Sequence, residues 1–304
     1  MNTQIIRKAV RLFKNPIVVG QIVLDFLSPL LPDKLYLKIF HRLHLGYPLN
    51  LKHPRTYQEK LQWLKLYNRN PEYTIMADKV KAKEWVAGKI GWEHIIPTIG
   101  VWKTPDKIDF NALPDKFVLK CNHNSGLGMC ICKDKRNLNI KAVKKELRKG
   151  VKQNYFLHAR EWPYKDIPHL IFAEKFMTDG LNTDLTDYKF FCFDGEPFMM
   201  YVSQDNAEHA TTDFFDMNFN RLPIRMKDPN SETIPSKPEK FEEMKNFARI
   251  LSKGIPHVRV DFYIINHVVY FGEMTFFHNA GSTKIYPDEW NYIIGDLIKL
   301  PKKN

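Results

Sequence analysis

Val258-Arg-Val-Asp-Phe-Tyr263 and Val269-Tyr-Phe-Gly-Glu-Met274 are the two stretches that decide the fold. Both are rich in β-branched and aromatic residues, which favour strands, and Asn266-His267 between them is typical of a tight turn. The pattern therefore predicts a hairpin that carries Asp261 on one strand and Glu273 on the other. Carboxylates among apolar neighbours are costly unless they are paired or bound to a metal.

The two carboxylates have two interpretations. Hard oxygen ligands on a rigid hairpin suit Mg²⁺, which usually takes one or two carboxylates together with the phosphates of a nucleotide. The same residues also fit ordinary acids at a strand edge, with Arg259 as an ion-pair partner. The hairpin alone leaves both interpretations open, and the choice depends on phosphate-binding parts elsewhere in the chain.

Length and composition describe a large globular protein. The 304 residues suffice for two packed lobes, and 44% hydrophobic with 13% aromatic residues excludes a disordered chain. No apolar run reaches the length of about 18 that a membrane-spanning helix needs, and no secretory signal is expected. The cysteines are few and lack zinc-site spacing, which predicts free thiols in a reducing, cytoplasmic compartment. They are Cys121, Cys130, Cys132 and Cys192.

The net charge is +12, from 46 basic and 34 acidic residues. Such a balance favours an anionic partner, for which a nucleotide, an acidic glycan, nucleic acid and an anionic membrane are the candidates. The chain has no arginine-rich tract and no repeated basic-aromatic module, so nucleic acid is not expected.

Residues 1–78 are expected to be mainly helical. Residues 7–24 mix basic and apolar side chains, which fits either an amphipathic anchor on a membrane surface or a helix packed on the body of the protein. The apolar spacing in 57–67 predicts a half-buried helix. Residues 76–87 predict a further helix, with Asp78 as its cap or first-turn acid.

The remaining chain alternates short strands with helices. Antiparallel hairpins within this order predict an α+β enzyme core. Strands are expected at 95–102, 117–119, 170–176, 188–193 and 197–202, and helices at 139–151 and 238–253.

Two segments have the composition of nucleotide-binding parts. Residues 117–133 read as a strand, a small-residue loop with Ser125, Gly126 and Gly128, and a second strand. Glycine lets backbone amides approach phosphate closely, and Lys120 at the strand end adds a positive charge, although no Walker motif is present. Residues 171–177 form an apolar strand ending in an acid, which fits an adenine-reading edge or a plain core strand.

In this order, the segments resemble the ATP-grasp superfamily and, more closely, its TupA-like family, which is associated with teichuronopeptide and other surface polysaccharide synthesis. The resemblance runs from about residue 40 to the C-terminus and rests on several long motifs. They are residues 57–66 (YQEKLQWLKL), 117–123 (FVLKCNH), 160–162 (REW), 187–195 (DYKFFCFDG) and 271–276 (FGEMTF).

The resemblance implies an ATP-grasp fold, with a helical region at 1–78, a lid lobe with a glycine flap at 79–180 and a C-terminal lobe with the hairpin at 181–304. It also implies roles for individual residues. ATP would contact Lys79, Lys120, Ser125, Gly126, Gly128, Glu174, Lys175, Phe176, Met177, Asp187 and Lys189. Arg259 would steady oxyanion charge, with Lys120 as a second catalytic cation, and Asp261 and Glu273 would bind Mg²⁺. Thr275 stands where the superfamily often has asparagine, and Asn279 or His278 is an alternative ligand.

The implied reaction is ATP-dependent joining of a carboxylate to an amine through an acylphosphate. The basic surface fits a uronic-acid glycan or its precursor as acceptor, with an amino acid or amine as co-substrate, near an anionic membrane surface. Arg160, Trp162 and Tyr164 fit either a sugar platform or a structural pair of Arg160 with Glu161 beside a core tryptophan. The alternatives are a glycosyltransferase, although an Asp-x-Asp motif is missing, a sugar kinase, and a non-catalytic membrane-surface scaffold.

Overall fold

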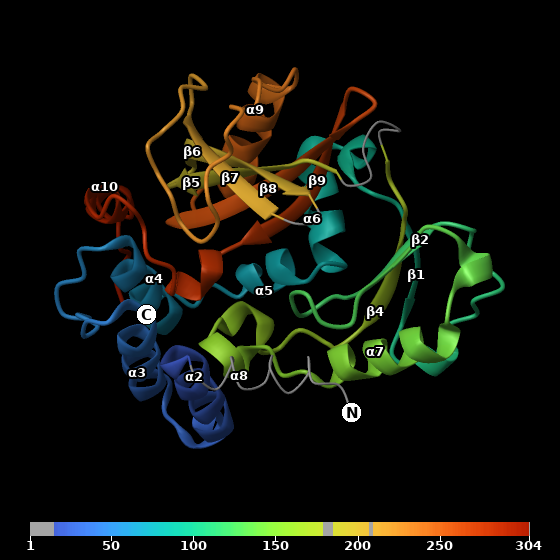
Figure 1. Ribbon diagram of the computed structural model, residues 1–304, viewed down its shortest axis with the longest axis horizontal. Helices are drawn as coiled ribbons and strands as arrows, with labels where there is room; N and C mark the ends of the chain where they lie inside the picture. The colour runs from blue at the N-terminus through green and yellow to red at the C-terminus, as the bar shows by residue number, and fades with distance from the viewer. Residues whose placement is uncertain (1–14, 179–184, 207–208, 304) are drawn as a thin grey trace.

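The computed structural model describes residues 15–178, 185–206 and 209–303 (Figure 1). The basic side chains at the start of the predicted anchor, Arg7, Lys8, Arg11 and Lys14, lie outside the described residues. Within the described parts, no helix combines the length and the apolar character needed to cross a bilayer.

The N-terminal part is helical, as predicted. Its helices are α2 (Pro16–Leu27), η1 (Ser28–Leu30), α3 (Asp33–Leu45), α4 (Tyr57–Tyr67), α5 (Glu72–Ala77) and α6 (Lys81–Ile90). Helix α4 starts with a capping box, in which Thr56 accepts from the Glu59 amide while the Glu59 carboxylate accepts from the Thr56 amide. Because this motif satisfies amides that a helix start leaves free, it fixes where α4 begins.

The expected continuous helix at 76–87 is wrong. The chain leaves helix α5 at Asp78 and enters α6 at Lys81. Asp78 Oδ1 accepts from the amides of Val80 and Lys81, so the carboxylate caps α6 and competes with helical hydrogen bonding at its own position. The break places Lys79 in the connection between the two helices.

The described strands form two antiparallel sheets. The larger sheet has the order β7-β6-β5-β8-β9 and the smaller has the order β1-β4-β2-β3. The larger sheet contains β5 (Asp187–Phe193), β6 (Glu196–Asn206), β7 (His209–Asp216), β8 (His257–Ile265) and β9 (Val268–Thr275). The smaller sheet contains β1 (Thr98–Trp102), β2 (Phe117–Cys121), β3 (Cys130–Cys132) and β4 (Ile171–Lys175).

Most predicted strands are confirmed. The predicted hairpin is the pair β8 and β9, and both turn residues, Asn266 and His267, adopt the positive φ angles that such a turn requires. The strand expected from Ile95 begins only at Thr98. Ile95 instead makes an isolated bridge to Phe271 on β9.

The helices cover the sheets and fill the space between them. Helix α9 (Phe241–Ser252) packs against β5, β6 and β8, and α7 (Ile140–Lys152) packs against β2. Figure 1 shows α5 and α6 between the two sheets, with α8 (Phe156–Ala159) and α10 (Glu289–Leu297) nearer the helical N-terminal part. The cysteines are free thiols, as predicted, and Cys130 and Cys132 lie on β3.

Candidate active site

Alternation along the strands gathers the predicted polar residues on one face of the larger sheet. Side chains two residues apart on a strand point to the same side. Asp187 and Lys189 on β5 therefore share a face, as do Arg259 and Asp261 on β8. The register sets Lys189 directly opposite Asp261, and Lys189 Nζ donates to Asp261 Oδ2 at 3.0 Å.

A β-bulge brings Glu273 toward this cluster. The register of β8 and β9 shifts between Val260 and Phe262, opposite the Gly272-Glu273 step. A Cβ on Gly272 would lie 3.1 Å from the Asp261 carbonyl oxygen and from the Tyr263 ring, so the bulge needs the small residue.

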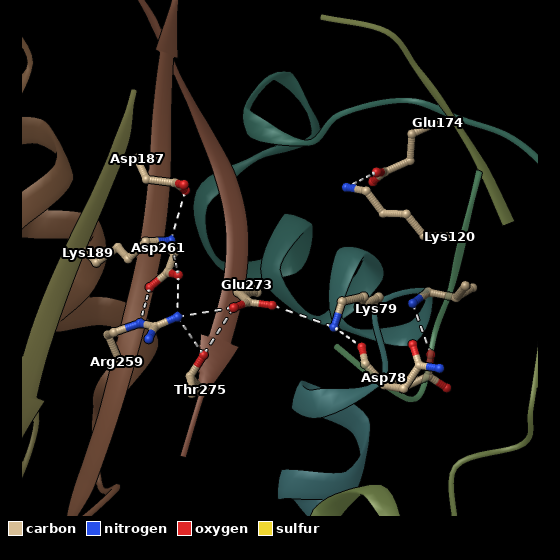
Figure 2. A network of polar contacts seen from close by, with 12 residues as sticks. Asp78, Lys79, Lys120, Glu174, Asp187, Lys189, Arg259, Asp261, Glu273 and Thr275 are labelled. Carbon is tan, nitrogen blue, oxygen red and sulfur yellow. Dashed lines mark hydrogen bonds and ion pairs between the residues drawn. The ribbon is translucent and has the colours of Figure 1, made fainter. Parts of the chain in front are cut away.

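Arg259 holds the two carboxylates together. Its Nε and Nη2 donate to Asp261 Oδ1 and Oδ2, each at 2.7 Å, and Nη2 also donates to Glu273 Oε1 at 3.1 Å (Figure 2). Nη2 lies 3.0 Å from Thr275 Oγ1, and Nη1 donates to His278 Nδ1 at 2.7 Å. The structure therefore contains the predicted ion pair between Arg259 and Asp261. The same cluster includes Glu273, the other predicted metal ligand.

Lys79 reaches the cluster from the break between α5 and α6. Its Nζ lies 3.5 Å from Glu273 Oε2 and donates to the Asn124 carbonyl at 3.0 Å. Its backbone amide donates to the Asn122 carbonyl, while Asn122 Nδ2 donates to Asp78 Oδ1 at 2.9 Å. These bonds fix Lys79 between the hairpin and the glycine loop, as Figure 2 shows.

Glu174 on β4 pairs with two lysines, Lys120 on β2 and Lys83 on α6. Its carboxylate pairs with Lys83 at 2.6 Å and with Lys120 at 2.8 Å. Burial opposes ionisation of Glu174, but Lys120 and Lys83 outweigh it and lower the pKa of the carboxyl. The carboxylate therefore stays charged and holds the two ammonium groups beside each other.

The predicted glycine loop connects β2 to β3, which are antiparallel neighbours. Gly126 and Gly128 both have positive φ angles, +79° and +72°, that favour glycine. A Cβ on Gly128 would lie 2.8 Å from the Gly150 Cα on α7, whereas one on Gly126 would meet nothing within 4 Å. Gly128 thus anchors the loop on α7, and Gly126 lies in open space.

Two adjoining cavities separate the sheets. The first, of about 220 Å³, is lined by Lys79, Lys83, Lys120 and Lys189 together with Glu174, Asp261 and Glu273, besides Ser125 and Gly126. The second, of about 520 Å³, shares Lys120 and Glu174 with the first. Its apolar lining includes Ile96, Val118, Met129, Ile131, Phe176 and Met177, with Lys175 and Asp187 at its edge. Gly128, Arg259 and Thr275 belong to the described residues but lie outside both linings.

The electrostatics favour an anionic ligand. Four lysines outnumber three carboxylates in the lining of the first cavity. Burial opposes ionisation of Glu273, but Lys79 and Arg259 lower its pKa to about 2. Burial raises the pKa of Asp187, although Lys189 acts against this.

The oxygen atoms fit Mg²⁺. Asp261 and Glu273 contact the same Arg259 nitrogen, and the Thr275 hydroxyl donates to Glu273 Oε1 at 3.3 Å. Carboxylate and hydroxyl oxygens are the hard ligands that Mg²⁺ takes along with nucleotide phosphates. Among the described residues no cluster of three or more His, Cys, Asp and Glu side chains could hold a metal ion.

Three features of the site were not anticipated. Lys83 follows Lys79 by four residues and lines the same cavity, and Tyr263 continues the alternation of Arg259 and Asp261.

Helix α4 is buried on its polar side as well, where Gln58, Gln62 and Lys65 donate to the carbonyls of residues 280–283. The predicted half-buried helix is therefore more deeply packed, because its polar groups hold the loop that carries His278.

The sugar platform at residues 160–164 is wrong. Arg160 is buried and pairs with Asp33 at 2.9 Å, while its Nη2 donates to the carbonyls of Ser28 and Leu31. Trp162 is buried in the core cluster. The ion pair is structural, but its acid is Asp33 rather than the adjacent Glu161.

Comparison with solved structures finds several similar folds. D-alanine–D-alanine ligase from Helicobacter pylori aligns with a TM-score of 0.45 and 14% identity, over 80% of this chain and 69% of that one. D-alanine–D-alanine ligase from Bacillus anthracis complexed with ATP aligns with a TM-score of 0.40 and 16% identity, over 66% of this chain and 53% of that one. N5-carboxyaminoimidazole synthase from Aspergillus clavatus aligns with a TM-score of 0.39 and 11% identity, over 69% of this chain and 46% of that one. The chain thus spans about half the length of the latter two.

Comparison with curated proteins finds no match. A family model described as TupA-like ATPgrasp matches residues 59–299, which is most of the 304 residues. The match covers both sheets and the cavities between them, and it confirms the α+β ATP-grasp fold expected from the sequence. The chain therefore belongs to the TupA-like ATP-grasp family.

Proposed function

We propose that the protein is an ATP-dependent carboxylate–amine ligase that works through an acylphosphate and produces ADP. One observation carries the proposal. The Asp261 and Glu273 carboxylates line a polar cavity together with Lys79 and Lys120, and this cavity adjoins a larger, mainly apolar one. A nucleotide has the matching form, with an apolar ring at one end and charged phosphates at the other.

The two cavities divide the binding of ATP between them. The apolar cavity would take adenine against Glu174, Lys175, Phe176 and Met177, all of which line it. The polar cavity would take the phosphates, with Lys79 and Lys120 as cations. Ser125 and Gly126 would supply backbone amides from the loop that Gly128 anchors. Asp187 and Lys189 would lie near the ribose and phosphates.

Mg²⁺ would be held by Asp261, Glu273 and Thr275 together with phosphate oxygens. When bound, it supplies positive charge to the transferring phosphoryl group. Arg259 aligns both carboxylates, because its guanidinium contacts both. We further assign Arg259 the stabilisation of oxyanion charge, and Lys120 the neutralisation of charge on the transferring phosphate.

The reaction has two balanced steps. A substrate carboxylate oxygen attacks the γ-phosphorus of ATP, and the bond from that phosphorus to the ADP oxygen breaks. The nitrogen of the amine then attacks the acyl carbon, the bond to phosphate breaks, and the amine loses a proton to give an amide and inorganic phosphate. The protein needs no covalent nucleophile, because positioning and charge stabilisation carry phosphoryl transfer.

The net charge of +12 supports an acidic acceptor. We propose a uronic-acid glycan, or its precursor, destined for a cell-surface polysaccharide, with an amino acid or another amine as the second substrate. We place the reaction in the cytoplasm, where ATP is supplied and the free thiols are stable. Residues 79–180 would act as the lid and residues 181–304 as the metal-carrying lobe.

The test is a substrate-omission assay with Mg²⁺, uronic-acid glycans and a pool of amino acids, following ADP, AMP and phosphate. ADP and phosphate release that requires both carboxylate and amine supports the ligase. Hydroxylamine, which traps acylphosphates, should convert the activated carboxylate into a hydroxamate. ADP with a phosphorylated glycan and no need for an amine would instead identify a sugar kinase.

A further inference from the structure

The hairpin of α2, η1 and α3 exposes an unusual concentration of large apolar side chains. Phe26 is 83% exposed and Leu30 81%. Six further exposed apolar residues lie within the same short stretch of chain, namely Ile17, Ile22, Val23, Leu27, Leu35 and Ile39. Exposed apolar side chains concentrated in this way mark an interaction site in a folded protein.

The exposed side chains belong to a hairpin that is firmly attached to the protein. Leu24 and Ser28 are buried on the inner side of α2 and η1. A Cβ on Gly20 would lie 2.6 Å from a Leu43 methyl carbon, so α2 packs closely on α3. Arg160 also ties this segment to the body through Ser28, Leu31 and Asp33. The outward apolar surface is therefore presented by a fixed support.

Basic residues accompany the apolar ones. Lys34, Lys38 and Arg42 are exposed and lie four residues apart on α3, so they form one row. Leu35 and Ile39 follow Lys34 and Lys38 directly in the sequence. The acids of the hairpin have partners of their own, since Asp25 pairs with His158 and Asp33 with Arg160.

The sequence ahead of the hairpin extends the same character. The first 24 residues contain no acid, and they include Arg7, Lys8, Arg11 and Lys14. Large apolar side chains combined with positive charge and little negative charge are the signature of a surface that rests on anionic lipid.

We infer that the hairpin of α2, η1 and α3 docks the protein onto an anionic membrane surface. Phe26 and Leu30 enter the interface, and Lys34, Lys38 and Arg42 contact lipid headgroups. The inference is independent of the ligase proposal, because it concerns surface residues away from both cavities. It would hold the enzyme at the membrane surface through interfacial contact.

Vesicle flotation with the full chain tests the inference. We expect the protein to bind vesicles containing phosphatidylglycerol and to bind neutral phosphatidylcholine vesicles at least about tenfold more weakly. High salt should abolish the binding to anionic vesicles. The double variant F26D/L30D should reduce binding about tenfold or more, as should K34E/K38E. Because these side chains are exposed, circular dichroism and ATP turnover in solution should stay unchanged.

A control is I234D, which places a single aspartate on another exposed apolar residue, 55% exposed, in a surface loop. This variant should bind vesicles as the wild type does. Equal binding by F26D/L30D and wild type would overturn the inference. So would a wild-type chain that ignores vesicles but forms a dimer in light scattering that F26D/L30D abolishes, because the face would then join two copies.

Discussion

Lys189 and Asp261 lie directly opposite each other on β5 and β8, joined by a hydrogen bond of 3.0 Å. Asp261 also accepts hydrogen bonds from Nε and Nη2 of Arg259. One buried carboxylate thus pairs with two cations at once. Burial opposes the charge on Arg259, yet Asp261 raises its pKa well above the ordinary value. The arrangement keeps a full set of charges at the base of the polar cavity.

Replacing Asp261 by asparagine should therefore destabilise the fold as well as the site. The substitution leaves Lys189 and Arg259 without their shared anion in a buried position, which costs about 3 kcal/mol of unfolding free energy. Urea denaturation measures the loss. The matched control is D194N, because Asp194 forms an exposed pair with Lys299 and should change stability by less than about 1 kcal/mol. Equal stability of D261N and wild type would contradict the structural role.

Glu174 should control nucleotide affinity through the two lysines it holds. In E174Q, Lys83 and Lys120 lose a buried anion at 2.6 and 2.8 Å and move away from each other. We expect the Kd for ATP to rise about tenfold, equivalent to about 1.4 kcal/mol. Isothermal titration calorimetry measures this, with E196Q as control because Glu196 pairs with Arg249 on the surface. An unchanged Kd would show that Lys120 needs no such support.

The two loop glycines should respond differently to alanine. G128A combines a positive φ with a Cβ 2.7 Å from Cys121 Sγ, and should lower the unfolding free energy by about 2 kcal/mol. G126A has only the unfavourable φ, which should lower the unfolding free energy by about 1 kcal/mol. Thermal denaturation should therefore show the larger fall in Tm for G128A. The reverse order would mean that the loop is not anchored on α7.

The acid limb of stability should depend on Glu273. Its pKa of about 2 lies below the ordinary 4.5, so its contribution to stability is complete above about pH 4.5 and is lost as the pH falls through the folded value. The difference in unfolding free energy between wild type and E273Q should be constant near neutrality and shrink on acidification toward about pH 3. Urea denaturation of wild type and E273Q, near neutral pH and at about pH 3, tests this. A difference that grows in acid would contradict the assignment.

The sequence predicts the central hairpin because its signals are local. Strand-forming residues flank Asn266-His267, and the alternation that places Arg259 and Asp261 on one face also predicts Tyr263 beside them. Lys83 does not follow from such a period, because Lys79 lies in the break before α6 and the two lysines do not share a helix.

Other features depend on contacts between distant segments. The helix break at Asp78 follows from competition between its carboxylate and the helix, together with the bond from Asn122, which is 44 residues away. The burial of Arg160 depends on Asp33 and Ser28, which no local pattern pairs with it. The register that sets Lys189 against Asp261 joins strands 72 residues apart. Such pairings are set by tertiary packing rather than by local propensity.

Calorimetric titration of ATP into the wild-type protein, with Mg²⁺ and with EDTA, tests the central claim most directly. The account predicts ATP binding that is markedly tighter with Mg²⁺, and a D261N/E273Q variant whose remaining affinity no longer depends on the metal. A wild-type protein that binds no ATP, or a variant that keeps the full effect of Mg²⁺, would contradict a nucleotide site built on these two carboxylates.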